Sequence, residues 1–127
     1  NTKDGRGIIN AIKNGIKVGF LSSGVKSKLI KDRAKLLGVD FVHVGKENKL
    51  DILNKWTKEL NIELSEVAYV GDDINDLSLV DKVGVFACPS DSIISIKSES
   101  DLILEKEGGK GCIREFIDTH LKLEINE

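Results

Sequence analysis

Residues 67–76 read Val-Ala-Tyr-Val-Gly-Asp-Asp-Ile-Asn-Asp, an apolar run followed by a glycine and by three carboxylates within five residues. The run predicts a buried strand, and Gly71 lets the backbone turn sharply at its end. The carboxylates of Asp72, Asp73 and Asp76 repel one another unless a cation lies among them. A magnesium ion binds through a few carboxylates together with phosphate oxygens, so this loop predicts a Mg²⁺ site. The alternative is an acidic turn that caps a helix beginning near Asp76.

Apolar runs with the spacing of strands and of helices alternate along the rest of the chain. Strands are predicted over residues 16–21, 41–44 and 67–70, and shorter ones over 83–86 and 102–104. Helices are predicted to end near Gly15 and Gly38, and further helices are predicted over 50–60 and 113–121. This alternation predicts an α/β fold, a Rossmann-like parallel sheet between two layers of helices.

Composition narrows the class of protein. A chain of 127 residues fits one domain, and its net charge of -2 gives no reason to expect nucleic acid or an anionic membrane as a partner. No apolar run approaches the roughly 20 residues that span a bilayer. Cys88 and Cys112 are too few for a disulfide scaffold and favour a reducing cytoplasm, with a single bridge between them as the alternative. The chain begins at Asn1 and contains no methionine, so we expect a processed, cut or incompletely recorded protein, with a frayed tail after Leu121.

Polar residues follow each of the first three predicted strands. Ser22, Ser23 and Gly24 follow the first, Lys49 opens the helix after the second, and the acidic loop follows the third. Ligands of such folds bind beyond the carboxyl ends of the strands, so we expect these residues to share one edge of the sheet. Taken singly, Lys49 also fits a solvated surface lysine, and Ser22 an ordinary helix cap.

A hydroxyl, a lysine and a metal-binding loop together suit phosphoryl transfer. The transition state spreads negative charge over the phosphoryl oxygens, and catalysis is largely positioning and charge stabilisation. A nucleophile is missing from the set. Asp4 has the context of a helix start rather than of a strand end, His43 lies inside a strand, and His120 lies in the last helix.

Four segments carry a family resemblance: residues 3–8, 48–50, 67–77 and 108–116. Their order resembles the haloacid dehalogenase (HAD) phosphatases, in which a Ser or Thr, a Lys and an acidic loop follow successive strands. The closer resemblance is to the small, capless branch that acts on sugar-acid phosphates. That branch includes 3-deoxy-manno-octulosonate 8-phosphate phosphatases, nonulosonate 9-phosphate phosphatases and the carboxy-terminal domain of some acylneuraminate cytidylyltransferases.

The resemblance implies roles for the residues at the predicted edge. Asp72 is expected to be a direct ligand of Mg²⁺. Asp73 and Asp76 are expected to support the metal and its waters, Asp76 as part of the metal site and Asp73 as a catalytic residue. Ser22 holds the phosphate, with Ser23 as a rival one residue away, and Lys49 balances the phosphate charge.

The resemblance also implies how the substrate is held. The family forms tetramers in which the tail of a neighbouring subunit closes the active site, and here the loop of residues 108–111 and Arg114 would form that tail. The alternatives are a flexible turn for the loop and a surface helix residue for Arg114. Lys26 could replace the Arg or Glu of relatives, where this chain has Val25. The expected substrate-binding residues are Ser23, Gly24, Lys26, Arg33, Asn75, Gly109, Lys110 and Arg114.

One family motif, an upstream strand that ends in Asp-x-Asp and supplies the nucleophile, is absent from residues 1–127. That strand is central in the family's sheet, so we expect the complete protein to contain it and residues 1–127 alone to be inactive and poorly folded. The leading hypothesis is Mg²⁺-dependent hydrolysis of a phosphomonoester on a small acidic sugar. The alternatives are a non-catalytic HAD-like assembly domain of an acylneuraminate cytidylyltransferase, and a receiver domain, whose acidic pair and lysine come in the reverse order.

Overall fold

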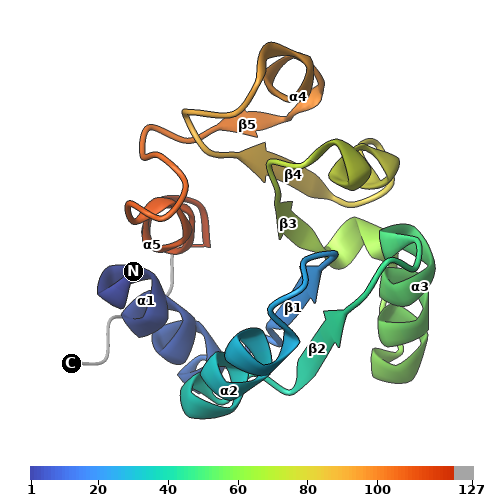
Figure 1. The fold of residues 1–127 in the computed structure, drawn as a ribbon, viewed down its shortest axis with the longest axis vertical. Coiled ribbons are helices and arrows are strands. Elements are labelled where there is room, and N and C mark those ends of the chain that lie inside the picture. The colour runs from blue at the N-terminus through green and yellow to red at the C-terminus, as the bar shows by residue number, and fades with distance from the viewer. Residues whose placement is uncertain (122–127) are drawn as a thin grey trace. The chain divides into compact units, whose positions relative to one another are not determined.

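The computed structural model describes residues 1–121, so the tail expected to fray lies outside the described residues. The chain forms two compact units, which are described separately (Figure 1). One unit comprises Asn1–Glu47 with the described residues from Ile113 onward, and the other comprises Asn48–Cys112. The expectation of a single domain stays a prediction.

The first unit contains a pair of parallel strands, β1 (Gly19–Ser22) and β2 (Phe41–Val44), in register from Gly19 opposite Phe41 to Ser22 opposite Val44. Helix α1 (Thr2–Lys13) precedes β1, and α2 (Ser27–Leu37) connects the strands and ends at Gly38 in a left-handed conformation. The last helix, α5 (Cys112–Phe116), continues into a π-helical turn over Ile117–Leu121. The core of this unit consists of Ile8, Ala11, Ala34, Val39 and Ile117.

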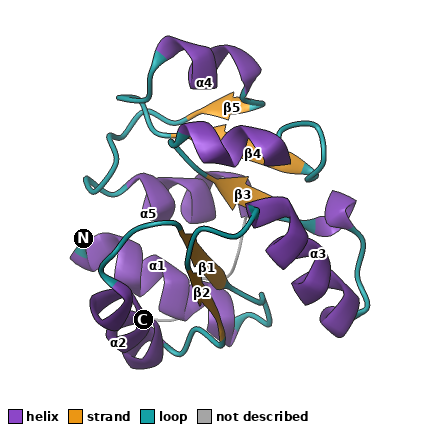
Figure 2. Ribbon diagram, turned by 45° about the vertical axis from the view of Figure 1, so that its right-hand side comes forward, coloured by secondary structure: helices purple, strands orange, loops and turns teal. Residues whose placement is uncertain are grey.

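The second unit contains a three-stranded parallel sheet in the order β3 (Ala68–Val70), β4 (Val85–Cys88) and β5 (Leu102–Ile103) (Figure 2). Helix α3 (Lys49–Leu60) and a 3₁₀ turn (Leu64–Glu66) precede β3, a 3₁₀ helix (Ile74–Leu79) follows it, and α4 (Ile94–Glu99) precedes β5. The largest fully buried side chains of this unit are those of Phe86, Leu79, Ile96, Leu104 and Cys88.

Two predicted strands are displaced along the chain. The strand predicted over 16–21 begins only at Gly19, because the amide of Ile16 donates to the Ala11 carbonyl and closes the end of α1. The strand predicted over 83–86 begins at Val85, because the Val83 amide bonds back to Leu79. The helix predicted near Asp76 is a 3₁₀ helix, and α4 was not predicted.

The parallel α/β class is confirmed, but the single sheet is not observed. Strands β1 and β2 form one sheet and β3 to β5 another, and within residues 1–121 no strand joins the two. This matches the expectation that the family's sheet needs a further strand. No helix within the same residues is long and apolar enough to cross a membrane.

Candidate active site

The acidic loop folds as a helix cap. Asp73 lies at the start of the 3₁₀ helix, and its carboxylate accepts the Ile74 amide at 3.1 Å. The carboxylate of Asp76 reaches back and accepts the Asp73 amide at 3.0 Å, which completes a capping box. The capping interpretation is therefore correct for Asp73 and Asp76, and Asp72 lies outside the capping box.

Asp76 is the centre of a buried hydrogen-bond network. Its side chain lies 3 % exposed, and its Oδ1 atom accepts both the Lys49 Nζ and the Tyr69 hydroxyl at 2.6 Å. Lys49 opens α3, as predicted, and is only 7 % exposed, so the interpretation as a solvated surface lysine is wrong. With three donors on its two oxygens, Asp76 is better suited to hold Lys49 than to coordinate an ion directly.

Gly71 allows this network to form, for a different reason from the one predicted. The backbone φ angle of Gly71 lies outside the left-handed region, so residues other than glycine could adopt this backbone conformation. A Cβ atom here would lie 2.6 Å from Asp76 Oδ2 and 2.7 Å from a ring carbon of Tyr69. Glycine is needed because only a hydrogen atom fits between the backbone and these two side chains.

Tyr69 was quoted only as part of a matching segment, and its contribution to the site was missed. Its ring packs against Phe86, with 5.7 Å between ring centroids. Burial, followed by the negative charges of Asp76, Asp72 and Asp73, strongly raises the pKa of Tyr69. The hydroxyl therefore stays protonated and donates to Asp76. The signal in the sequence was a tyrosine in an otherwise apolar strand, because a buried hydroxyl needs a partner.

Asp72 is exposed, and within residues 1–121 its carboxylate accepts no hydrogen bond. Partial burial and the charges of Asp76, Asp73 and Asp91 raise its pKa, while Lys49 lowers it. A free carboxylate in a surplus of negative charge suits a hard divalent cation, so this residue fits the predicted Mg²⁺.

The acidic loop does not form a complete metal site by itself. Among the described residues, no group of three His, Cys, Asp or Glu side chains converges closely enough to hold a metal ion. Asp73 and Asp76 are turned into the capping box, so their expected role of supporting the metal and its waters stays a prediction. Further oxygen ligands for an ion at Asp72 must come from phosphate, water or other residues.

Asp91 is a second residue that sequence analysis missed. It lies three residues beyond β4, and its Oδ1 atom accepts the Gly108 amide at 2.9 Å. Only the residues that directly follow the first three predicted strands were considered. Asp91 follows the fourth strand, whose position was also predicted incorrectly, so it was not considered. Position beyond the carboxyl end of a strand was the signal that could have found it.

The Ser22 turn belongs to the first unit. Ser22 is the last residue of β1, and its Oγ atom accepts the Gly24 amide at 3.0 Å. The hydroxyl hydrogen remains available to donate to an anion. Ser23 is half-buried, whereas Gly24 and Lys26 are exposed. Because Lys49 and the acidic loop belong to the second unit, the predicted convergence of Ser22 with them stays a prediction.

The other expected substrate contacts are divided between the two units. Arg33 donates to the Asn1 carbonyl at 3.2 Å, so its guanidinium is engaged at the start of α1. Arg114 pairs with Asp118 at 2.7 Å, and its amide donates to Asp4. The remaining three residues, Asn75, Gly109 and Lys110, are exposed in the second unit.

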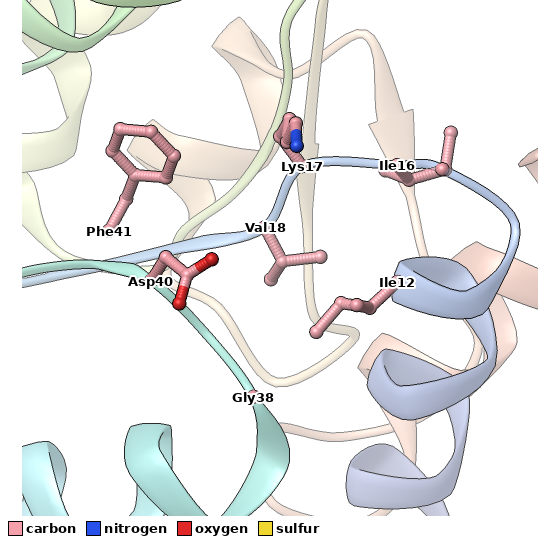
Figure 3. Close-up of a pocket in the computed structure, with 8 residues that line it drawn as sticks. Ile12, Ile16, Lys17, Val18, Gly38, Asp40 and Phe41 are labelled. Carbon is pink, nitrogen blue, oxygen red and sulfur yellow. The ribbon is translucent and has the colours of Figure 1, made fainter.

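A hollow of about 70 Å³ lies in the first unit (Figure 3). Val18 and Phe41 line it at the amino ends of β1 and β2, together with Lys17 and Asp40. Ligands of parallel α/β folds bind at the opposite, carboxyl ends, and none of the predicted site residues lines this hollow. It is therefore not the candidate active site.

Comparison with known proteins tests the family resemblance. The family model of haloacid dehalogenase-like hydrolases matches residues 4–83. The chain belongs to this family. Within these hydrolases it belongs with the 3-deoxy-D-manno-octulosonate 8-phosphate phosphatases, which confirms the resemblance and excludes the receiver alternative.

The individual relatives support this placement of the hydrolase. The chain is 35 % identical over 118 residues to the 3-deoxy-D-manno-octulosonate 8-phosphate phosphatase of Escherichia coli K12. The alignment includes 93 % of this chain. It spans 62 % of that relative's length. The crystal structure of the Moraxella catarrhalis phosphatase is 35 % identical, with a TM-score of 0.89 over 95 % of this chain and 69 % of that one. The Yersinia pestis structure gives a TM-score of 0.89 at 30 % identity, over 93 % and 63 %.

Proposed function

We propose that the protein carrying this chain is a Mg²⁺-dependent phosphatase that hydrolyses a phosphomonoester on a small acidic sugar. The observation that carries the proposal is the buried Lys49–Asp76 pair close to the exposed carboxylate of Asp72. A lysine fixed by a carboxylate, beside a free carboxylate able to hold a cation, supplies the charges that a transferring phosphoryl group needs.

Each residue then has a defined task. Asp72 would hold Mg²⁺, which when bound neutralises charge on the phosphate oxygens. Lys49 donates to another phosphate oxygen, because Asp76 Oδ1 holds only one side of its ammonium group. Ser22 donates its hydroxyl hydrogen to the phosphate, and Asp73 supports the metal site by shaping the loop.

The attacking group is assigned to an aspartate upstream of Asn1. In this proposal its carboxylate attacks phosphorus, the ester P–O bond breaks, and the sugar oxygen leaves and is protonated. Water then hydrolyses the aspartyl-phosphate and restores the carboxylate. The chain spans about 62 % of the length of its curated relatives, which leaves room for such a segment.

The substrate assignment rests on the relatives. The Moraxella catarrhalis structure is a complex with a magnesium ion, a phosphate ion and a KDO molecule, and a Haemophilus influenzae relative was solved in a cobalt-bound form. By analogy, the proposed substrate is an octulosonate 8-phosphate or a nonulosonate 9-phosphate. The proposed contacts to it are Ser23, Gly24, Lys26, Arg33, Asn75, Gly109, Lys110 and Arg114.

Assembly and location are parts of the same proposal. A homotetramer would let Arg114 serve a neighbouring subunit, while the loop of residues 108–111 would serve the subunit that carries it. Cys88 and Cys112 are both buried and form no disulfide among the described residues, which supports the expectation of a reducing compartment such as the cytoplasm.

The test is phosphate release by the product of the complete open reading frame. Sugar-acid phosphates and a generic phosphomonoester are assayed with Mg²⁺, with EDTA, and with Mg²⁺ restored after EDTA. We expect the highest kcat/KM on a sugar-acid phosphate, loss of turnover in EDTA and recovery with Mg²⁺. A folded complete protein that hydrolyses none of these esters would instead favour the assembly-domain alternative.

A further inference from the structure

A glycine loop, residues 108–111, lies against the carboxylates of the second unit. The Gly108 amide donates to Asp91 Oδ1 at 2.9 Å. A Cβ atom on Gly108 would lie 3.6 Å from Asp72 Oδ2 and 3.7 Å from Asp91 Oδ1. The loop therefore begins at van der Waals distance from the carboxylate assigned to the metal.

We propose that Asp91 is a positioning residue that anchors the glycine loop beside Asp72, so that the metal-binding carboxylate and the loop carrying Lys110 are held together. This proposal rests on the proposed function, because it places the loop in the phosphatase site. The phosphate and metal chemistry stay with Lys49 and Asp72, and Asp91 acts through the loop.

A second contact strengthens the anchor. The Ser90 amide donates to the Lys106 carbonyl at 3.0 Å, so the segment after β4 holds the start of the loop at two points. Pro89, buried beside Asp91, lies 3.7 Å from the position of a Cβ on Gly108. A hydrogen bond to an ionised carboxylate is stronger than one between neutral groups, which makes Asp91 the dominant contact.

The far side of the loop has a backbone conformation that favours glycine. Gly109 and Gly111 have φ values of +74° and +99°, which residues other than glycine rarely adopt. A Cβ atom at either position would meet no atom within 4 Å. The Lys110 amide bonds to the Glu107 carbonyl, which makes a turn that presents the exposed Lys110 side chain. The loop is thus held at Gly108, and its turn leaves the Lys110 side chain exposed.

Asp91 also contributes charge. Its Oδ1 atom and Asp72 Oδ2 both lie within 3.7 Å of the position of a Cβ on Gly108, so its negative charge adds to the field in which a cation would bind. Its two contributions can be separated: asparagine keeps an oxygen that accepts the Gly108 amide but lacks the charge, whereas alanine lacks both.

The experiment compares Asp91→Ala, Asp91→Asn and Glu99→Gln in the complete protein. Glu99 is an exposed carboxylate on α4 that is not among the groups shifting the pKa of Asp72, so it controls for the loss of a charge. Hydrogen exchange of the segment 105–112 is followed by mass spectrometry, and Mg²⁺ binding is measured by calorimetry. Neither readout requires turnover.

We expect Asp91→Ala to speed exchange in the segment about tenfold, the factor that corresponds to one lost charge-assisted hydrogen bond. Asp91→Asn should keep most of the protection, while both variants weaken Mg²⁺ binding severalfold and Glu99→Gln changes neither. With sugar-acid phosphate, Asp91→Ala should raise KM more than Asp91→Asn does.

Unchanged hydrogen exchange of the segment 105–112 in Asp91→Ala would overturn the proposal. A loss of Mg²⁺ affinity in Glu99→Gln equal to that in the Asp91 variants would also overturn it. If the complete protein hydrolyses no ester but Asp91→Ala still loses protection in the segment, the anchor stands and the proposed function fails.

Discussion

At the scale of single residues, one buried carboxylate organises the candidate site. Asp76 accepts hydrogen bonds from Lys49, Tyr69 and the Asp73 amide. Breaking a buried ion pair leaves an uncompensated charge, so each of these contacts supports the others. The site is thus a rigid network to which Asp72 adds a free carboxylate.

The ionisation of Tyr69 tests this network directly, because it is the sole tyrosine of the 127 residues. An ordinary tyrosine loses its proton near pH 10, whereas burial and three carboxylates raise the pKa of Tyr69 in the folded protein. The unfolded chain therefore loses this proton first, so the stability contributed by Tyr69 is present below about pH 10 and is lost as the pH rises above it.

In the complete protein, we expect the part of the absorbance at 295 nm that Tyr69→Phe removes to rise only as the alkaline circular dichroism signal is lost. Tyr69→Phe should lack the absorbance step and should lose stability less steeply above pH 10. A reversible step near pH 10 in a protein whose circular dichroism is unchanged would contradict the buried hydrogen bond.

Gly71 offers a second test at this scale. In Gly71→Ala the new methyl group would meet the Asp76 carboxylate and the Tyr69 ring at 2.6–2.7 Å, so the network has to shift. We expect a loss of about 1–3 kcal/mol in the free energy of unfolding, measured in urea, together with loss of most activity. Gly38→Ala is the control, because there the strain comes from a φ of +81° with no atom near the new methyl group. It should lower stability but leave kcat unchanged; equal kcat losses in both variants would exclude the local explanation.

Sequence reasoning identified Lys49 and Asp72 from their order after successive strands, and it missed Tyr69 and Asp91. Order along the chain predicts which residues reach one end of a parallel sheet. It does not predict which oxygen accepts which donor, because that depends on side-chain directions and on the space left by Gly71. This is why the hydrogen bonds of Asp76 with Lys49, Tyr69 and the Asp73 amide were not predicted, while its role in the metal site stays a prediction.

At the scale of the elements, helix and strand periodicity placed β2 and α3 correctly and displaced β1 and β4. The displaced ends lie where amides bond back to a preceding helix, as Ile16 does to Ala11. Apolar side chains continue through such turns, so hydrophobicity alone cannot locate the first residue of a strand. The short α4 carries too little periodic pattern to be predicted.

The start of α5 depends on a side chain distant in sequence. Asp4 on α1 is buried, and its Oδ1 accepts the Arg114 amide at 2.9 Å. Asp4→Ala leaves this amide without a partner, so we expect a loss of about 1–3 kcal/mol in the free energy of unfolding. Asp4→Asn, which keeps an acceptor, should lose less. Equal stability of the wild type and Asp4→Ala in urea denaturation would show that the contact contributes nothing.

At the scale of the whole molecule, the chain contains two parallel sheets, and none of the strands within residues 1–121 links them. Unpaired strand edges favour association with other chains. We expect residues 1–127 alone to aggregate or to melt over a broad temperature range, and to release no phosphate. The complete open reading frame should give a sharp transition and Mg²⁺-dependent turnover. Equal melting curves and equal turnover for the two lengths would contradict the need for a further strand and nucleophile.

In the proposed function, Asp72 holds the magnesium ion of a phosphatase. Its most direct test is phosphate release from a sugar-acid phosphate by Asp72→Asn in the complete protein, with Asp51→Asn, an exposed aspartate on α3, as the matched control. Asparagine keeps the shape of the side chain and removes the charge that a cation requires. We predict that Asp72→Asn retains the wild-type melting temperature within a few degrees and loses at least about 99 % of kcat, which is the loss expected when one transition-state contact is removed. Asp51→Asn should keep wild-type turnover. Undiminished turnover in a folded Asp72→Asn protein would contradict the account.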